Sequence, residues 1–262
     1  MTLGKIALFA ALTVASPLST SVSAEPAKPV RSAKQVQEPD IMGVWEMYPD
    51  PYAGENANGF LELPVPGDGP KLKEPYAGKW KAARDKRDAM LKAGTPLVDR
   101  STLCLPEGMP MIMGAIFPLQ ILQTPGQVTV LAEFLTQTRR IHLGKTMPTQ
   151  DDLNPSYGGY SVGKWEGDTL VVTTRGVRED VEFFEIPHSA QMTITERIRL
   201  TGPGLMENQI TIDDPKMLAE PYRFTYGYQR NDAYEIMEYI CDREDPLSKV
   251  NADGTIEMRL DQ

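Results

Sequence analysis

One segment in the second half of the chain decides the fold: Gly159-Tyr160-Ser161-Val162-Gly163-Lys164-Trp165-Glu166-Gly167-Asp168-Thr169-Leu170-Val171-Val172-Thr173-Thr174. Two runs rich in β-branched and aromatic residues flank a central Glu-Gly-Asp, and Gly167 can adopt the positive φ of a tight reversal. The pattern predicts a β-hairpin with one strand on each side of Gly167. Similar runs lie before and after it, so this hairpin indicates the architecture of the whole domain.

The other predicted strands follow at regular spacing. Together with a first strand around Trp45, they bring the expected number to about nine. They cover residues 128–134, 137–143, 192–200, 206–212, 222–229 and 234–241. An antiparallel meander of this kind most economically closes into a barrel, which leaves no edge strand exposed. We therefore predict an all-β fold with a single β-barrel domain over residues 41–262.

One helix is predicted outside the barrel, over residues 79–93. Apolar residues recur there at helical spacing, and Gly94 followed by Pro96 ends the pattern. We expect this helix to lie against the barrel wall or over one end. Long loops are expected on both sides of it, and residues 251–254 favour one more short hairpin turn near the C-terminus.

The N-terminus has the features of a secretory signal peptide. Lys5 precedes an apolar core over residues 6–14, and Val22-Ser23-Ala24 forms a small-x-small cleavage site. We predict cleavage after Ala24, followed by a flexible leader over residues 25–40. The later sequence has no apolar stretch long enough to cross a bilayer. The expected product is soluble and either periplasmic or secreted.

Charge and cysteine content narrow the possible partners and the compartment. The formal net charge of −9 disfavours nucleic acid and anionic membranes, which are bound through clustered Lys and Arg. A small molecule is the expected partner, whereas the oligomeric state is not predicted. The two cysteines, Cys104 and Cys241, predict one disulfide in an oxidising compartment. A redox or catalytic thiol is the alternative, although the chain has no Cys-x-x-Cys motif.

The hairpin contains a literal Gly-x-Ser-x-Gly motif centred on Ser161. A nucleophile elbow requires a helix directly after the serine, whereas here a strand and a turn follow. We therefore do not assign Ser161 as a nucleophile. The two glycines are better explained by a bend in the strand or by the close approach of a neighbour.

Metal-binding residues are scarce, because His142 and His188 are the two histidines of the chain. A three-histidine site cannot be built from them, and neither a metal nor a cofactor is predicted. Met109, Met111 and Met113 could hold Cu(I) through their thioethers. The alternative is that they form a flexible apolar lining.

Polar residues recur on strand faces that otherwise look interior. Glu196 lies midway along the apolar face of its strand, and a buried carboxylate must be paired or protonated. Glu133 and Glu238 occupy comparable positions, Arg140 shares a face with His142, and residues 222–228 present an aromatic stripe. We expect these faces to enclose a cavity that suits a small, largely apolar, aromatic ligand.

Three hypotheses follow for the function. The first is a cofactor-independent lyase, dehydratase or isomerase in which Glu196, His188 and Arg140 are catalytic. The second is a periplasmic carrier that uses the same cavity without turnover. The third is a structural or envelope-interaction protein whose barrel is filled by its own side chains. For the first two, the expected ligand-contacting residues are Tyr160, His142, Glu133, Trp165, Tyr226 and Glu238.

The hairpin also carries a family resemblance. The run Ser-x-Gly-x-Trp-Glu-Gly-Asp-Thr-Leu-Val-Val resembles the signature of a largely uncharacterised family of exported bacterial β-rich proteins. The flanking matches are Arg139-Arg140-Ile141, His188-Ser189, Glu196-Arg197 and Asp213-Asp214-Pro215. The resemblance implies a shared β-rich fold and no established activity. The chain departs from the pattern at Tyr160, where a histidine is expected, and before Gly144, where an aspartate is missing.

A second resemblance, at the level of the fold, lies at the first strand. Gly43-Val44-Trp45 resembles the start of lipocalin-like (calycin-type) barrels, in which the indole plugs one end.

Overall fold

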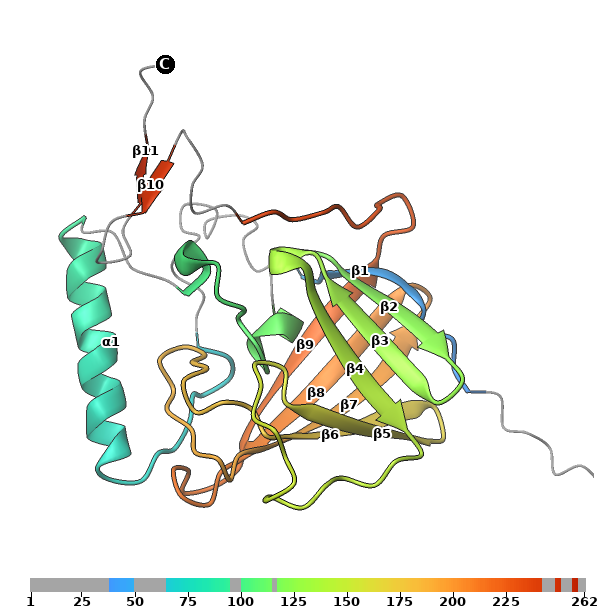
Figure 1. Cartoon of the computed structure of the whole chain (residues 1–262), viewed down its shortest axis with the longest axis horizontal. Helices are drawn as coiled ribbons and strands as arrows, with labels where there is room; N and C mark the ends of the chain where they lie inside the picture. The colour runs from blue at the N-terminus through green and yellow to red at the C-terminus, as the bar shows by residue number, and fades with distance from the viewer. Residues whose placement is uncertain are drawn as a thin grey trace, which may run out of the picture. The chain divides into compact units, whose positions relative to one another are not determined.

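Nine strands close into one barrel in the order of the sequence (Figure 1). The computed structural model describes residues 38–49, 65–94, 100–114, 117–241, 248–250 and 256–258. The barrel strands are β1 Gly43–Met47, β2 Leu119–Thr124, β3 Gln127–Ala132, β4 Gln137–Leu143, β5 Tyr160–Glu166, β6 Thr169–Arg175, β7 Thr193–Gly202, β8 Leu205–Asp213 and β9 Tyr222–Arg230. The predicted all-β barrel is confirmed, including the hairpin of β5 and β6.

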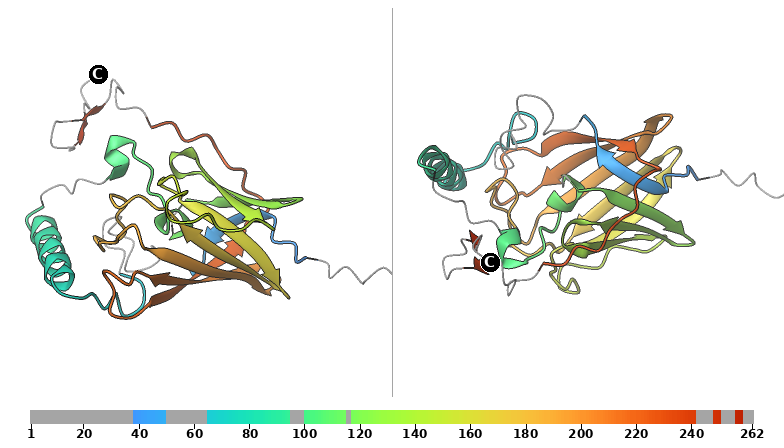
Figure 2. Two further views of the ribbon diagram at one scale, coloured as in Figure 1. Left: turned by 60° about the horizontal axis from the view of Figure 1, so that its bottom comes forward. Right: turned by 90° about the horizontal axis from the view of Figure 1, so that it is seen from above.

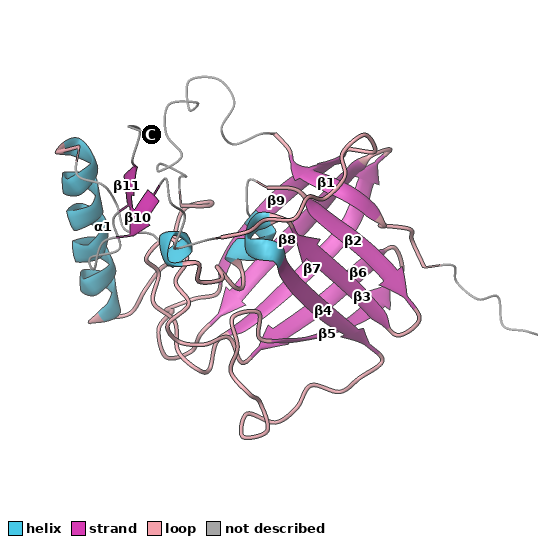
Figure 3. Cartoon of the chain, turned by 45° about the horizontal axis from the view of Figure 1, so that its top comes forward, coloured by secondary structure: helices cyan, strands magenta, loops and turns pink. Residues whose placement is uncertain are grey.

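The strands pair with their sequence neighbours, and β1 closes the ring by pairing with β9. All neighbouring pairs are antiparallel except β4 and β5, which run in the same direction. Because of this one parallel pair, residues 144–159 return along the outside of the barrel from the end of β4 to the start of β5 (Figures 1 and 3).

The predicted strand over residues 234–241 is wrong. Residues 231–241 form no strand, and the edge of β9 that this segment would have covered pairs with β1 instead, with Trp45 opposite Arg230. A ninth strand comes from β2, which the sequence did not indicate. The expected number of strands was therefore reached through two errors that cancel.

The inward faces follow the alternation expected for half-buried strands. On β9 the inward residues are Tyr222, Phe224, Tyr226 and Tyr228, and on β7 they include Ile194 and Ile198 on both sides of Glu196. The buried core runs through the whole barrel, whose closed wall is seen from two further directions in Figure 2.

One end of the barrel is plugged by Trp45, whose side chain is wholly buried. Its indole Nε1 donates to the carbonyl oxygen of Ile41 at 3.0 Å, and the guanidinium of Arg230 lies 4.9 Å from its ring centre. The cation–π contact and the hydrogen bond satisfy both the face and the polar edge of the indole. We call the opposite end, where β1, β3, β6 and β8 finish, the mouth.

The predicted helix is confirmed as α1, Tyr76–Lys92. Trp80 donates from its indole to the carbonyl oxygen of Phe184 at 3.0 Å, and both Arg84 and Arg87 pair with Glu185. These contacts attach α1 to the connection between β6 and β7, at the mouth. Short 3-10 turns are η2 Arg100–Leu103, η3 Met111–Gly114 and η4 Phe134–Thr136.

Near the C-terminus, β10 Ser248–Val250 pairs antiparallel with β11 Ile256–Met258, as the predicted hairpin requires. The predicted signal peptide and residues 25–37 of the leader lie outside the described residues. In the described part of the chain, no helix combines the length and apolar character needed to cross a membrane.

Candidate functional site

Glu196 lies in the middle of the barrel interior, where it is wholly buried and paired with Arg139. Arg139 donates from Nη1 to Oε1 at 3.0 Å and from Nη2 to Oε2. The amide of Asn208 donates to Oε1 at 2.9 Å. Three strands, β4, β7 and β8, therefore meet at one carboxylate.

The remaining donors of Arg139 are directed at two hydroxyl groups on β5 and β6. Ser161 Oγ accepts from Nε and Nη2 at 3.3 Å each, and Thr174 Oγ1 accepts from Nη2 at 3.0 Å. The two hydroxyl oxygens are 2.8 Å apart. Ser161 thus serves as an acceptor for a cation, which is the opposite of what activation as a nucleophile requires.

This polar layer joins five neighbouring strands, from β4 to β8. Both carboxylate oxygens of Glu196 already accept hydrogen bonds, so neither is free to take a proton from a ligand without breaking the network. The Coulomb attraction and hydrogen bonds offset the cost of burying two charges. We interpret the layer as a structural clamp of the wall.

The assignment of Arg140 to the interior is wrong, since its neighbour Arg139 occupies that place. On β4 the inward residues are Arg139 and Ile141, whereas Arg140 is exposed on the outer face and His142 lies partly buried on that same face. The apolar side chain of Ile141 decides which face of β4 points inward. Ile141 is completely buried, and Arg139, two residues earlier, lies on the same face. The sequence offered two adjacent arginines, and the wrong one was paired with Glu196.

The other two predicted interior acids also lie elsewhere. Glu133 is buried at the start of η4 and accepts from Tyr234 Oη at 2.7 and 2.9 Å and from the backbone N–H of Met237 at 3.0 Å. Glu238 is exposed. The prediction for Glu133 assumed a strand that runs to residue 134, whereas β3 ends at Ala132. The prediction for Glu238 assumed a strand over residues 234–241. In place of that strand, an extended segment starts beside β1, where the N–H of Asn231 donates to the carbonyl oxygen of Val44, and runs along the outside of the barrel to the rim of the mouth (Figure 1). We call residues 231–241 the strap.

A second segment, residues 105–114, enters the mouth, and we call it the cap. Met109, Ile112 and Met113 of the cap are buried in the barrel core. Tyr228 donates to the carbonyl oxygen of Met113 at 2.6 Å, and a Cβ on Gly114 would lie 2.6 Å from Tyr226 Oη. Only glycine allows this approach of the cap to β9. The Met-rich stretch therefore packs as an apolar lining.

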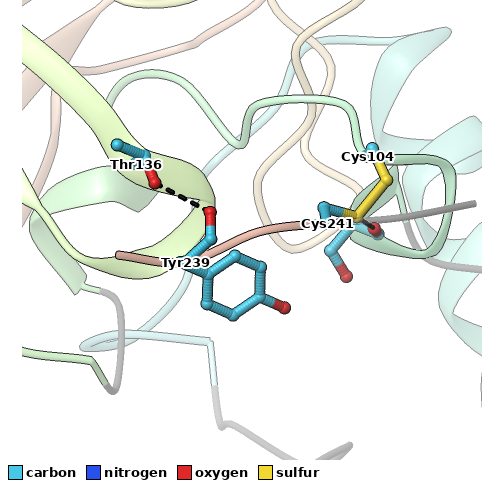
Figure 4. Close-up of a disulfide and its surroundings, with 5 residues drawn as sticks. Cys104, Thr136, Tyr239 and Cys241 are labelled. Atoms are coloured by element: carbon cyan, nitrogen blue, oxygen red, sulfur yellow. Dashed lines mark hydrogen bonds between the residues drawn. A yellow bond between two sulfur atoms is a disulfide. The ribbon is translucent and has the colours of Figure 1, made fainter. Parts of the chain in front are cut away.

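The predicted disulfide is present and joins Cys104, directly before the cap, to Cys241, the last residue of the strap. The sulfur atoms of Cys104 and Cys241 are 2.09 Å apart. Close by, the hydroxyl of Thr136 donates to the carbonyl oxygen of Tyr239 at 2.8 Å (Figure 4). Phe117, Phe134 and Tyr239 pack as an aromatic trio beside this contact. The disulfide and these contacts thus join the two segments at the rim of the mouth.

A small cavity remains at the mouth, beside His188. Its volume of about 10 Å³ is enough for one water molecule. Apolar and aromatic side chains form most of its wall, with His188 and Asp214 as the polar members. The apolar members are Phe183, Ile186, Pro187, Met192, Ile212, Leu218 and Tyr222.

His188 and Asp214 hold the connections around this cavity in place. The imidazole Nε2 lies 2.7 Å from the carbonyl oxygen of Val181, which fixes the ring by donation from Nε2–H. Asp214 accepts from the backbone N–H and the hydroxyl of Ser189 at 2.6 and 2.9 Å, and from two backbone N–H groups in its own loop. Asp214 was missed as a site residue, although it lies two residues after a predicted strand.

The predicted site residues therefore do not converge. Glu196 and Tyr226 lie inside the barrel, and Trp165 faces inward with partial exposure. His188 lies at the mouth. His142 and Tyr160 stack on the outer face, with ring centres 4.9 Å apart. The expected single cavity is replaced by three separate places.

Electrostatics differ between these places. Burial raises the pKa of the Tyr228 phenol well above its usual value, so this residue stays neutral and acts as a donor. Burial, together with the nearby Lys145 and Arg140, lowers the pKa of His142. The described ranges contain no group of three or more His, Cys, Asp or Glu side chains arranged to hold a metal ion. Comparison of the sequence with protein-family models and with curated proteins finds no match.

Proposed function

We propose that the protein is a binding or carrier protein for a small, largely apolar, aromatic molecule that it takes up at the mouth of the barrel. The observation that carries this proposal is the composition of the cavity beside His188. Its wall is apolar and aromatic, and only two polar residues face it. Small-molecule sites have this composition, in which a few polar groups orient a mostly apolar ligand.

The surroundings of Glu196 favour a binding protein over an enzyme. A lyase, dehydratase or isomerase needs an acid or base that reaches its substrate. The carboxylate of Glu196 is wholly buried and already accepts from Arg139 and Asn208. Acid–base catalysis by Glu196 would require this clamp to open, whereas binding at the mouth leaves it intact.

Binding at the mouth requires local movement. A dry cavity that holds benzene measures about 150 Å³, far more than the space beside His188. The cap is the segment we expect to move, because Met109 and Met113 have flexible side chains that can repack around a ligand. The wall of the barrel itself would stay closed.

The proposed setting is the periplasm or the extracellular space. The N-terminal sequence has the features of a cleaved signal peptide, and the disulfide suits an oxidising compartment. Membership of the exported family that the hairpin signature resembles is part of the same proposal. An oxidised, exported barrel is a suitable container for an apolar compound that dissolves poorly in water.

The test uses N-phenyl-1-naphthylamine, a neutral aromatic fluorophore whose emission rises in apolar surroundings. We expect saturable binding with one probe per chain. Leu218→Phe fills the cavity and should weaken binding by at least about tenfold, which is the effect of about 1.4 kcal/mol. Leu122→Phe makes the same substitution on the exposed outer side of β2 and should leave binding unchanged.

Two results would overturn the proposal. One is emission that rises without saturation, as expected for partitioning onto apolar surface patches. The other is equal weakening by the two phenylalanine substitutions. Circular dichroism of both variants checks that the barrel is folded, so that a lost signal can be assigned to the cavity.

A further inference from the structure

The outer faces of β3 to β6 carry an unusual balance of charge for this chain. The protein has 36 acidic and 27 basic residues, yet Glu166 is the one acidic residue within these four strands. Glu166 is itself paired with Lys164 and Arg197. This wall therefore presents positive charge on a protein whose net charge is negative.

Four side chains gather at one place on this wall. Arg140 and His142 are two residues apart on the outer face of β4, and Lys145 follows shortly after the strand. Tyr160 at the start of β5 stacks on His142, with an angle of 29° between the ring planes. Burial, followed by the charges of Lys145 and Arg140, lowers the pKa of His142.

Among the described residues, these cations have no acidic partner. In the part of the chain that the structure describes, neither Arg140 nor Lys145 has a carboxylate within 4.0 Å. By contrast, Arg199 on β7 pairs with Glu207 at 2.6 Å. Arg175, which lies opposite Tyr160 on β6, donates to the amide oxygen of Gln150 at 2.6 Å.

We propose that this outer patch, formed by Arg140, His142, Lys145 and Tyr160, is a second binding site that takes a small aromatic carboxylate. Arg140 and Lys145 hold the carboxylate through charge-assisted hydrogen bonds. The exposed parts of the stacked Tyr160 and His142 rings contact the aromatic ring of the ligand. This site is separate from the mouth and does not depend on the proposed function.

The test is nuclear magnetic resonance of the purified protein with benzoate as the probe, at pH 8 and constant ionic strength. The chain has only two histidines, so the His142 signal is read against that of His188 as an internal reference. We expect saturable shifts of the His142 and Tyr160 signals and none at His188. Acetate, which has the charge without the ring, and benzyl alcohol, which has the ring without the charge, should each bind at least several-fold more weakly.

Two substitutions that each remove one positive charge distinguish a specific benzoate site from general electrostatic attraction of the anion to the protein. Arg140→Gln should weaken benzoate binding by about tenfold, as expected for the loss of one charge-assisted hydrogen bond. Arg199→Gln removes the same charge on β7 and should change nothing. Equal shifts with acetate and benzoate, equal effects of the two substitutions, or shifts no larger than those with added chloride would each overturn the proposal.

Discussion

The middle of the barrel and its mouth differ in what fills them. The middle holds the most polar group of residues, Arg139 and Glu196 with their hydroxyl and amide partners, and they are buried and bonded to one another. The mouth is mostly apolar, yet it retains a small space beside His188. The comparison shows that polar residues inside a barrel can mark where the wall is fastened. The incomplete packing lies elsewhere, at the mouth, where we propose that the ligand binds.

The largest effect should come from breaking the clamp on one side. Arg139→Met leaves the carboxylate of Glu196 buried without its cation, and we expect a loss of about 3–5 kcal/mol in the free energy of unfolding. Urea unfolding followed by circular dichroism measures this loss. The double variant Arg139→Met with Glu196→Leu removes both charges and should be much less destabilised. A single variant within 1 kcal/mol of the parent would contradict the role of a clamp.

Removing the tie between cap and strap should have the next largest effect. Cys104→Ser with Cys241→Ser is expected to cost about 2–5 kcal/mol of stability. Hydrogen exchange distinguishes the two regions, because the amides of Met109, Ile112 and Met113 should exchange faster than those of β7 and β8 after correction for the global change. Uniform acceleration throughout the barrel would show that the cap does not move as a separate unit.

At the mouth itself, Asp214 provides a smaller and more local test. Asp214→Asn leaves the backbone N–H of Ser189 facing a weaker acceptor and should cost about 1–3 kcal/mol. If the mouth is where ligands enter, naphthylamine binding should change in this variant. Asp168→Asn, in the exposed turn of the hairpin, is the matched control and should change neither quantity.

The smallest effect concerns the outer face and depends on pH. Burial, Lys145 and Arg140 lower the pKa of His142 in the folded protein, so the unfolded chain binds its proton more tightly. The contribution of His142 to stability is therefore fully present above about pH 6.5, the unperturbed pKa, and is lost as the pH falls through the folded value. The midpoint measured by nuclear magnetic resonance should lie below 6.5 and should rise in Arg140→Gln. A midpoint at or above 6.5 would contradict this placement of charges.

Much of the fold could be predicted from the chain, because alternation and turn residues act locally. The hairpin of β5 and β6, the helix α1 and the disulfide between Cys104 and Cys241 are all present. Local pattern could not predict that residues 119–124 form a strand of the barrel and that residues 234–241 do not. Which strand covers the edge of β9 depends on β1, which lies far away in the sequence, and alternation does not encode that choice.

The site was predicted less well, for a related reason. Glu196 is indeed interior and paired with an arginine, but local pattern could not decide between Arg139 and Arg140. A shift of one residue moves a side chain from the core to the surface. Asp214 was missed because its role depends on Ser189 in another loop, a contact visible only once the strands are closed.

The parallel pairing of β4 and β5 follows from the odd number of strands in the barrel. Directions can alternate all the way round a ring only when the number of strands is even, and this ring has nine. One parallel pair, which we call the seam, is therefore unavoidable. In this protein it lies between β4 and β5, and residues 144–159 carry the chain back along the length of the barrel there. Because β1 begins and β9 ends at the same end of the barrel, a circular permutant joined there and opened at the seam would run as an unbroken up-and-down meander.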